Sequence, residues 1–193
     1  MEIKQAEFVI TVASPDKILQ STNYEFAFVG RSNAGKSSLI NALTRNKNLA
    51  KTSSTAGLTK NINYFKINKG QFYFVDLPGY GFHKAGKNDE DRWAELIESY
   101  LLNSKALKCV FVLTDIRHKA SENDLIMLKF LHYYQIPFVI LATKADKVKK
   151  SEIEKLRLNL SNSLALGVSD VIITSAEKKQ GLNSVLSIIE QYL

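Results

Sequence analysis

The eight residues 30–37 constrain this chain of 193 residues most, because they read Gly-Arg-Ser-Asn-Ala-Gly-Lys-Ser. This is the GxxxxGKS pattern of a phosphate-binding loop. The apolar run 24–29 precedes it and residues 38–43 suit the start of a helix, which is the strand–loop–helix context that the motif needs. Glycines let the backbone N–H groups turn toward phosphate oxygens, and the new helix adds partial positive charge. We expect Lys36 to reach the β- and γ-phosphates and Ser37 to ligate Mg²⁺.

The rest of the chain alternates strand-like and helix-like patterns. Apolar runs typical of strands occur at 62–67, 71–75, 107–113, 137–142 and 171–173. The first two are joined by a short turn and predict a hairpin. Amphipathic spacing predicts helices over 93–101 and 182–193. Capping boxes at Ser121-Glu122-Asn123-Asp124 and Ser151-Glu152-Ile153-Glu154 predict helices that run to about Tyr134 and Leu166. This order predicts an α/β fold of the three-layer P-loop NTPase type, with a mostly parallel six-stranded sheet, one antiparallel edge strand, and helices on both faces.

The ends and the composition indicate one domain with a short appendage. Residues 1–23 contain a β-like run at 7–12, and we expect them to form an N-terminal extension packed on a domain of residues 24–193. No run of 18 apolar residues occurs and the first ten residues lack an apolar signal core, so we expect no membrane span and no secretory signal. The single cysteine, Cys109, lies in an apolar run and is expected to be a buried strand residue in a reducing compartment.

Further polar segments follow the apolar runs, and ligands of such sheets bind at the carboxyl ends of the strands. The first is DxxG at 76–79, 40 residues after Lys36. Asp76 is expected to hold Mg²⁺, most simply through water, and the Gly79 N–H to bond the γ-phosphate, since no side chain keeps the backbone away. The residues expected to bind phosphate in the first loop are Gly30, Arg31, Ser32, Asn33, Ala34, Gly35, Lys36, Ser37 and Ser38.

The next segment, Thr143-Lys144-Ala145-Asp146, is suited to a guanine base. The Asp146 carboxylate can accept hydrogen bonds from guanine N1–H and the 2-amino group, a donor pair that adenine lacks. The aliphatic stem of Lys144 can lie over the base. Residues Thr174, Ser175 and Ala176 follow the last strand and would add a backbone N–H to guanine O6.

The long polar stretch 46–61 has no clear period and is expected to be a functional loop. It should supply a second metal hydroxyl, for which we choose Thr59 in Gly57-Leu58-Thr59. Its competitors are Thr52, Ser53, Ser54 and Thr55. A loop held by the γ-phosphate and Mg²⁺ acts as a switch that hydrolysis releases.

In this order the motifs resemble those of the translation-factor-related P-loop GTPases. GRSNAGKSS, DLPGYGF and TKAD in a short basic chain resemble the EngB family, and the resemblance extends from about Phe8 to the C-terminus. It implies a bacterial cytoplasmic, Mg²⁺-dependent GTPase that converts GTP to GDP and phosphate. It also implies assistance in assembly of the large ribosomal subunit and a need for the protein in normal cell division and septation.

Three positions depart from patterns common among these GTPases. Leu58 stands where an arginine often precedes the switch threonine, and Glu177 stands where lysine is common. Thr143 opens the guanine loop where many GTPases have asparagine, although the EngB family resembles the threonine form. These differences concern the fine contacts of the nucleotide and leave its class unchanged.

The residue after DxxG sets the expected rate of hydrolysis. Many switch GTPases orient the attacking water there with glutamine, whereas this chain has Tyr80. We therefore expect slow turnover that is stimulated either by a partner or by K⁺ held near Asn33, as in related GTPases with this asparagine. The candidate catalytic residues are Lys36, Thr59, Gly79 and Asn33. His83 lies in the following loop and is expected to face solvent or a partner.

The net charge of +7 and the pI of about 9.3 suit an anionic partner such as ribosomal RNA, although a soluble protein can simply be basic. A monomer is expected. A basic cluster near the guanine loop is either an RNA contact or a solvated face: Lys144, Lys147, Lys149, Lys150, Lys178 and Lys179. A nucleotide kinase also uses GxxxxGKS, but DxxG and TKxD and the scarcity of arginines argue against it. A GTP-gated protein-binding or division module with negligible hydrolysis stays open.

Overall fold

The structure, a computed structural model, describes residues 1–52, 60–80 and 87–193, with the backbone alone for 87–91 and 93. The predictions for Gly57, Leu58, Thr59, their competitors at 53–55, and His83 therefore lie outside the described residues.

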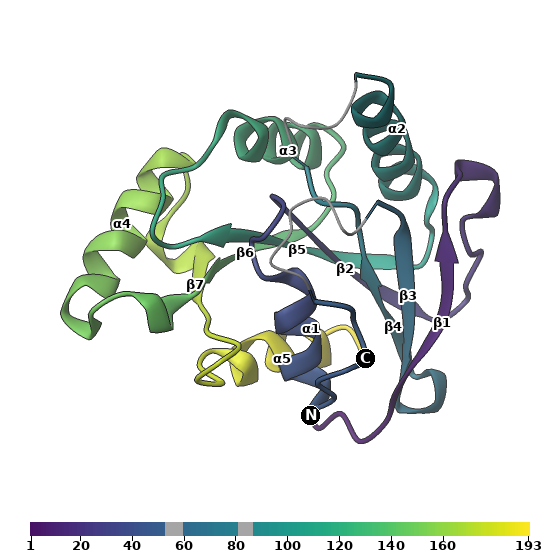
Figure 1. The fold of residues 1–193 in the computed structure, drawn as a ribbon, viewed down its shortest axis with the longest axis horizontal. Coiled ribbons are helices and arrows are strands. Elements are labelled where there is room, and N and C mark those ends of the chain that lie inside the picture. The colour runs from purple at the N-terminus through teal and green to yellow at the C-terminus, as the bar shows by residue number, and fades with distance from the viewer. Residues whose placement is uncertain (53–59, 81–86) are drawn as a thin grey trace.

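Within these ranges, seven strands form one sheet in the order β1-β3-β4-β2-β5-β6-β7 (Figure 1). Strands β2, β4, β5, β6 and β7 run parallel, whereas β3 runs antiparallel to both of its neighbours. The strands are β1 (Ala6–Val12), β2 (Tyr24–Gly30), β3 (Ile62–Ile67), β4 (Phe72–Asp76), β5 (Leu107–Asp115), β6 (Phe138–Thr143) and β7 (Val171–Ile173).

The α/β class and the hairpin are confirmed, but the predicted count of six strands and the antiparallel edge are wrong. The run near the N-terminus is itself strand β1, which pairs with β3 in a register that places Phe8 beside Phe65. The antiparallel strand β3 therefore lies inside the sheet and β1 forms the edge. Phe8, Val9 and Ile10 stay exposed there, so the run lacks the continuous burial by which the other strands are recognised. The domain boundary at residue 23 stays a prediction.

Helices cover both faces of the sheet (Figure 1). On one face lie α1 (Lys36–Thr44) and α5 (Leu182–Glu190), which pack with Phe26 and Phe28 of β2. On the other lie α2 (Lys87–Asn103), α3 (Glu122–Tyr133) and α4 (Ile153–Ser163), which pack with Ala27 and Val29. Strand β2 is thus buried on both faces, and each buried phenylalanine stabilises the fold by about 1.5–3 kcal/mol. This central position holds the start of the phosphate loop rigidly.

The starts of two helices test the predicted capping boxes. For α3 the prediction is confirmed, because the Ser121 hydroxyl accepts from the Asp124 N–H and the Asp124 carboxylate accepts from the Ser121 N–H. For α4 it is wrong. A 3₁₀ turn over 150–152 precedes the helix, whose N-cap Glu152 makes no side-chain cap. Ser151 therefore lies inside this turn, where the Glu152 N–H donates to the Lys149 carbonyl and the Ile153 N–H to the Lys150 carbonyl.

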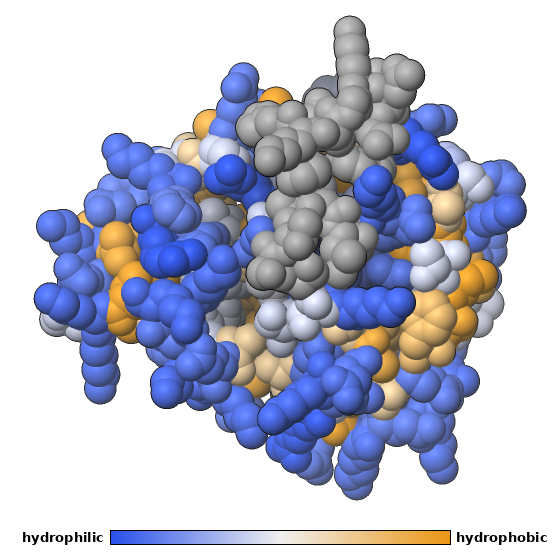
Figure 2. Space-filling view, in the orientation of Figure 1, coloured by the Kyte–Doolittle hydropathy of each residue, from blue (hydrophilic) through white to orange (hydrophobic). Residues whose placement is uncertain are grey.

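The surface is mostly hydrophilic in Figure 2, with apolar patches over β1 and α4. Cys109 is buried in β5, as predicted, and burial raises the pKa of its thiol to about 12. In the part of the chain that the structure describes, no helix is long and apolar enough to cross a membrane.

Candidate functional site

The phosphate loop connects the end of β2 to the start of α1, and two of its glycines are required by geometry. A Cβ at Gly30 would lie 2.5 Å from the Leu113 carbonyl oxygen of β5, so a side chain does not fit. Gly35 has a φ of 97° and is the N-cap of α1, which begins at Lys36. The loop therefore presents Lys36 and Ser37 in the first helical turn, where N–H groups have no partner within the helix.

Lys36 and Asp76 are brought together in a buried place. Lys36 is 7% exposed, and burial lowers the pKa of its amine, against an opposing effect of nearby Asp76. Asp76 is 2% exposed, and burial raises the pKa of its carboxyl to about 6, against Lys36 and a hydrogen bond from the Ser37 side chain. The Oδ1 atom of Asp76 has no hydrogen-bond partner among the residues described. An unpaired carboxylate oxygen beside a serine hydroxyl fits Mg²⁺, which prefers oxygen ligands.

The DxxG segment lies directly against the phosphate loop. A Cβ at Gly79 would lie 3.1 Å from Ser32 Oγ and 3.2 Å from Lys36 Nζ, so this approach favours glycine. The next residue, Tyr80, donates its N–H to the Gly30 carbonyl at 3.3 Å and accepts from the Ser32 N–H at 3.1 Å. Its ring hydroxyl donates to Asp124 Oδ1 of α3 at 2.8 Å. The Tyr80 hydroxyl is therefore engaged with a helix cap, a contact that the sequence pattern did not predict.

The guanine loop is fixed by hydrogen bonds to its neighbours. Ser175 Oγ donates to Asp146 Oδ1 at 2.6 Å, and Lys147 Nζ lies 3.1 Å from Asp146 Oδ2. Burial alone would raise the pKa of Asp146, but these two donors lower it below its usual value. The hydroxyl of Thr143 donates to the Ala34 carbonyl at 2.7 Å and so ties this loop to the phosphate loop. Asp146 is thus held ionised at a fixed position, as an acceptor for two N–H groups must be.

A second acid, which sequence reasoning missed, holds the lysine of this loop. Lys144 Nζ lies 3.0 Å from Oδ2 of Asp115, the last residue of β5. Arg117 also donates to Asp115, from Nε at 2.9 Å and from Nη2 at 2.7 Å. Burial raises the pKa of Asp115, but the Arg117 and Lys144 cations outweigh it and hold this pKa well below its usual range. An acid at the carboxyl end of a buried strand, two residues before an arginine, was the signal available in the sequence.

The remaining candidates are distributed as follows. Ser175 and Thr174 are buried, and the Ala145 N–H donates to the Thr174 carbonyl at 3.2 Å, which joins the last two loops. Glu177, noted above as a departure, lies 2.9 Å from Lys147. Thus all the described candidates lie at the carboxyl edge of the sheet: Gly30, Arg31, Ser32, Asn33, Ala34, Gly35, Lys36, Ser37, Ser38, Asp76, Gly79, Thr143, Lys144, Asp146, Thr174, Ser175 and Ala176. Their roles in binding stay predictions.

Comparison with known proteins gives concordant matches. The family model described as "50S ribosome-binding GTPase" matches residues 25–144. The "Probable GTP-binding protein EngB" of Clostridium kluyveri is 46% identical, with 100% of this chain and 98% of that protein covered. Its counterpart in a Geobacillus species is 39% identical over the full length of both.

Solved structures agree in fold. A crystal structure of a probable GTP-binding protein engB has a TM-score of 0.69 at 24% identity and covers 86% of this chain and 97% of that one. Era in complex with MgGDPNP and a segment of 16S ribosomal RNA has a TM-score of 0.71 at 23% identity and covers 88% of this chain and 56% of that one.

Proposed function

Since this chain belongs to the EngB family of GTP-binding proteins and carries its GTPase domain, we propose that it is a slow, Mg²⁺-dependent GTPase switch that assists assembly of the large ribosomal subunit. In this role it hydrolyses GTP to GDP and phosphate in the cytoplasm as a monomer. The need for it in normal cell division and septation is part of the same proposal and rests on the resemblance of its motifs to this family.

One observation carries the nucleotide proposal. The buried Lys36 and Asp76 lie on one side of the phosphate loop, and the ionised Asp146 lies on the other, tied to that loop through Thr143 and Ala34. A guanine nucleotide with Mg²⁺ matches this order of charges along its length. Ser37 and Asp76 would hold the ion together with Thr59. The bound ion would neutralise charge on the β- and γ-phosphates and leave positioning to the chain's own residues.

Slow hydrolysis follows from the contacts of Tyr80. Its hydroxyl donates its one proton to Asp124, so this proton is not available to a water at the γ-phosphate. We propose that the missing stabilisation comes from a ribosomal partner or from K⁺ held near Asn33. The same contact favours a second candidate, a GTP-gated binding module with negligible hydrolysis.

The ribosomal part of the proposal has three supports. The matching family model is described as a 50S ribosome-binding GTPase, and the chain carries a net charge of +7. Era, which has the same fold, has been crystallised with ribosomal RNA. A basic protein that binds RNA releases counterions, so its binding should weaken steeply with added salt.

The test is co-sedimentation of the full chain with large-subunit particles, loaded with a non-hydrolysable GTP analogue or with GDP. We expect more protein on the particles in the GTP-like state. Turnover of GTP is then measured in K⁺ and in Na⁺, with and without particles. GTP turnover that neither K⁺ nor the particles increase would favour the second candidate, the binding module. Equal binding to the particles in both nucleotide states would contradict a switch.

A further inference from the structure

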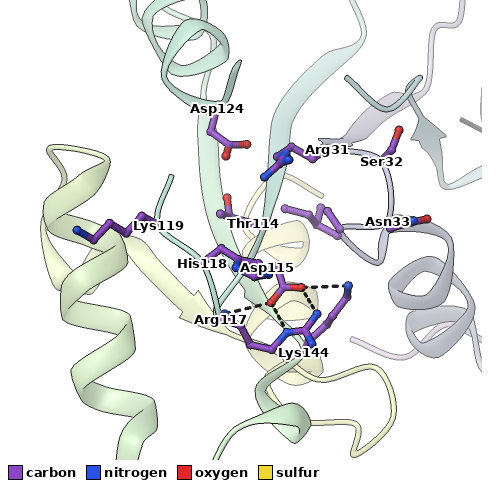
Figure 3. A pocket seen from close by; sticks show the side chains of 12 residues that line it. Arg31, Ser32, Asn33, Thr114, Asp115, Arg117, His118, Lys119, Asp124 and Lys144 are labelled. Atoms are coloured by element: carbon purple, nitrogen blue, oxygen red, sulfur yellow. Dashed lines mark hydrogen bonds and ion pairs between the residues drawn. The ribbon is translucent and has the colours of Figure 1, made fainter. Parts of the chain in front are cut away.

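A cavity of about 240 Å³ lies on the far side of the phosphate loop from α1 (Figure 3). One wall is formed by residues 31–34, and the other by the end of β5 and the loop 115–119 that leads to α3. Lys144 and Asp124 close its two ends. Five of its lining residues, Arg31, Ser32, Asn33, Ala34 and Lys144, are also among those expected to bind the nucleotide, so this cavity adjoins the predicted nucleotide site.

The acidic groups in its walls already have partners. Both oxygens of Asp115 accept hydrogen bonds from Arg117, and one of them also faces Lys144. Asp124 accepts from Tyr80 on one oxygen and from Ser121 on the other. The acceptors of the cavity are therefore largely occupied by its own donors.

Donors remain. Arg31 points into the cavity from the phosphate loop in Figure 3, and within the described residues its guanidinium makes no hydrogen bond or ion pair. The ring of His118 lines the same space. Thr114 is 4% exposed, and its hydroxyl has no hydrogen-bond partner in the described part of the chain. A buried hydroxyl without a partner costs stability, so this hydroxyl gains a hydrogen bond if a ligand enters the cavity.

We propose that this cavity binds one backbone phosphate of an RNA strand, held by Arg31 and the Thr114 hydroxyl with Arg117 at its rim. The inference rests on the RNA partner of the proposed function and assigns it a contact point. A phosphate offers tetrahedral acceptors and negative charge, which complement a guanidinium fork and a hydroxyl donor. Because Arg31, Ser32 and Asn33 form the wall, the bound strand contacts the phosphate loop directly.

The first test removes the hydroxyl with an isosteric change, Thr114→Val. Anisotropy of a fluorescent 12-nucleotide RNA is measured on the full chain loaded with GDP and Mg²⁺, so that the phosphate loop is filled. We expect RNA affinity to fall about tenfold, as for a lost hydrogen bond to a charged group. The melting temperature should stay equal or rise, because an unpaired buried hydroxyl is gone. A structural role would instead lower the melting temperature. The control Thr44→Val removes a buried hydroxyl that bonds helix carbonyls far from the cavity, and it should leave RNA affinity unchanged.

The second test removes charge with Arg31→Gln. The slope of log affinity against log salt should decrease by about 0.7, one phosphate contact on a single strand, whereas Thr114→Val should leave this slope unchanged. The exposed Lys105 at the opposite edge of the sheet provides a charge-matched control, Lys105→Gln, which should keep the wild-type slope.

A third readout separates the sources of phosphate. The NMR signal of the Thr114 methyl group should shift when RNA is added to the GDP-loaded protein. A shift with inorganic phosphate and none with RNA would overturn the proposal, as would wild-type RNA affinity in both cavity variants. GDP affinity measured on the same samples keeps the outcomes distinct. Failure of wild type to bind GDP contradicts the proposed function, whereas GDP binding with unaltered RNA affinity in the variants contradicts this site alone.

Discussion

The two sides of the phosphate loop differ in how completely their polar groups are paired. On the guanine side, Asp146 accepts from Ser175 and Lys147, and Lys144 is held by Asp115. On the γ-phosphate side, Asp76 Oδ1 has no partner among the described residues, and no described carboxylate lies within ion-pair distance of Lys36 Nζ. One half of the site is fixed by the protein alone, and the other is not.

This difference indicates how the two halves treat a ligand. A preorganised half binds without having to order its groups, and so it sets specificity. Buried charges that are incompletely paired lower the stability of the free protein and gain most when a counter-charge binds. We call the guanine side, with Asp146 and Lys144, the base half, and the γ-phosphate side, with Lys36 and Asp76, the metal half. We infer that the base half selects the nucleotide and that Mg²⁺ with phosphate completes the metal half.

The largest expected effect is loss of the base half through Asp146→Ala. Guanine N1–H and the 2-amino group would lose their acceptor, so GDP affinity should fall about 1,000-fold and the preference for GDP over ADP should largely disappear. Fluorescence titration with labelled GDP measures this, and unlabelled ADP serves as competitor. The matched change Ser175→Ala leaves the carboxylate in place and should cost only about tenfold, because it removes one hydrogen bond. A persistent preference for GDP in Asp146→Ala would contradict the assignment.

In the metal half, the substitution Asp76→Asn should be favourable to the free protein, because we expect it to raise the free energy of unfolding. The pKa of Asp76 is about 6 in the folded protein, above its ordinary value of 3.8. Between these pH values the unfolded chain loses the proton first, so the wild-type free energy of unfolding falls as pH rises from 4 to 6 and then stays low. Relative to wild type, the variant should therefore gain about 2.5 kcal/mol between pH 4 and pH 7.5 without ligand.

Urea unfolding at the two pH values measures this gain. The control Glu152→Gln removes one negative charge from an exposed side chain and should show no such gain. A gain of the same size at both pH values would contradict ionisation of Asp76 as the cause. Mg²⁺-dependent binding of GTP should be lost in Asp76→Asn, because its side chain is neutral.

A smaller effect is expected from Asp115→Asn, which weakens the hold on Lys144. The neutral amide keeps the shape but reduces the attraction for both cations, so GDP affinity should fall about tenfold. Isothermal titration calorimetry measures the affinity, and Arg117→Gln tests the other partner of Asp115. GDP binding that is unaffected by Asp115→Asn would indicate that Lys144 keeps its position without this acid.

The smallest effect is expected from Tyr80→Phe, which removes the hydroxyl that bonds Asp124. Loss of this hydrogen bond should destabilise the protein by about 1 kcal/mol. The rate of GTP hydrolysis by the free protein should stay within about twofold, because the hydroxyl is engaged with the helix cap and not with water. Single-turnover measurements with GTP test this. A fall of more than tenfold in the rate would show that the hydroxyl takes part in the reaction.

The sequence predicts those parts of the site that depend on local backbone requirements. Gly30 and Gly35 mark the phosphate loop because a close strand and a positive φ exclude side chains there. The role of Asp146 is inferred from chemistry that suits guanine and stays a prediction. The contacts of Asp115 with Lys144 and of Tyr80 with Asp124 join residues 29 and 44 positions apart, and no local pattern indicates such pairs.

The errors in the fold have related causes. Residues 7–11 of strand β1 are all exposed, so its burial pattern does not resemble that of the central strands, and its place at the sheet edge depends on pairing with β3. The capping pattern at Ser151 predicts the start of α4, but a 3₁₀ turn over 150–152 precedes this helix. In both cases a neighbouring element decides the outcome.

The most direct test of the two-sided site is calorimetric titration of the wild-type chain with GDP and with ADP, each with and without Mg²⁺. A base half fixed by the protein predicts that GDP binds in both conditions and more tightly with Mg²⁺, while ADP binds at least 1,000-fold more weakly in each. Equal binding of ADP and GDP would contradict it.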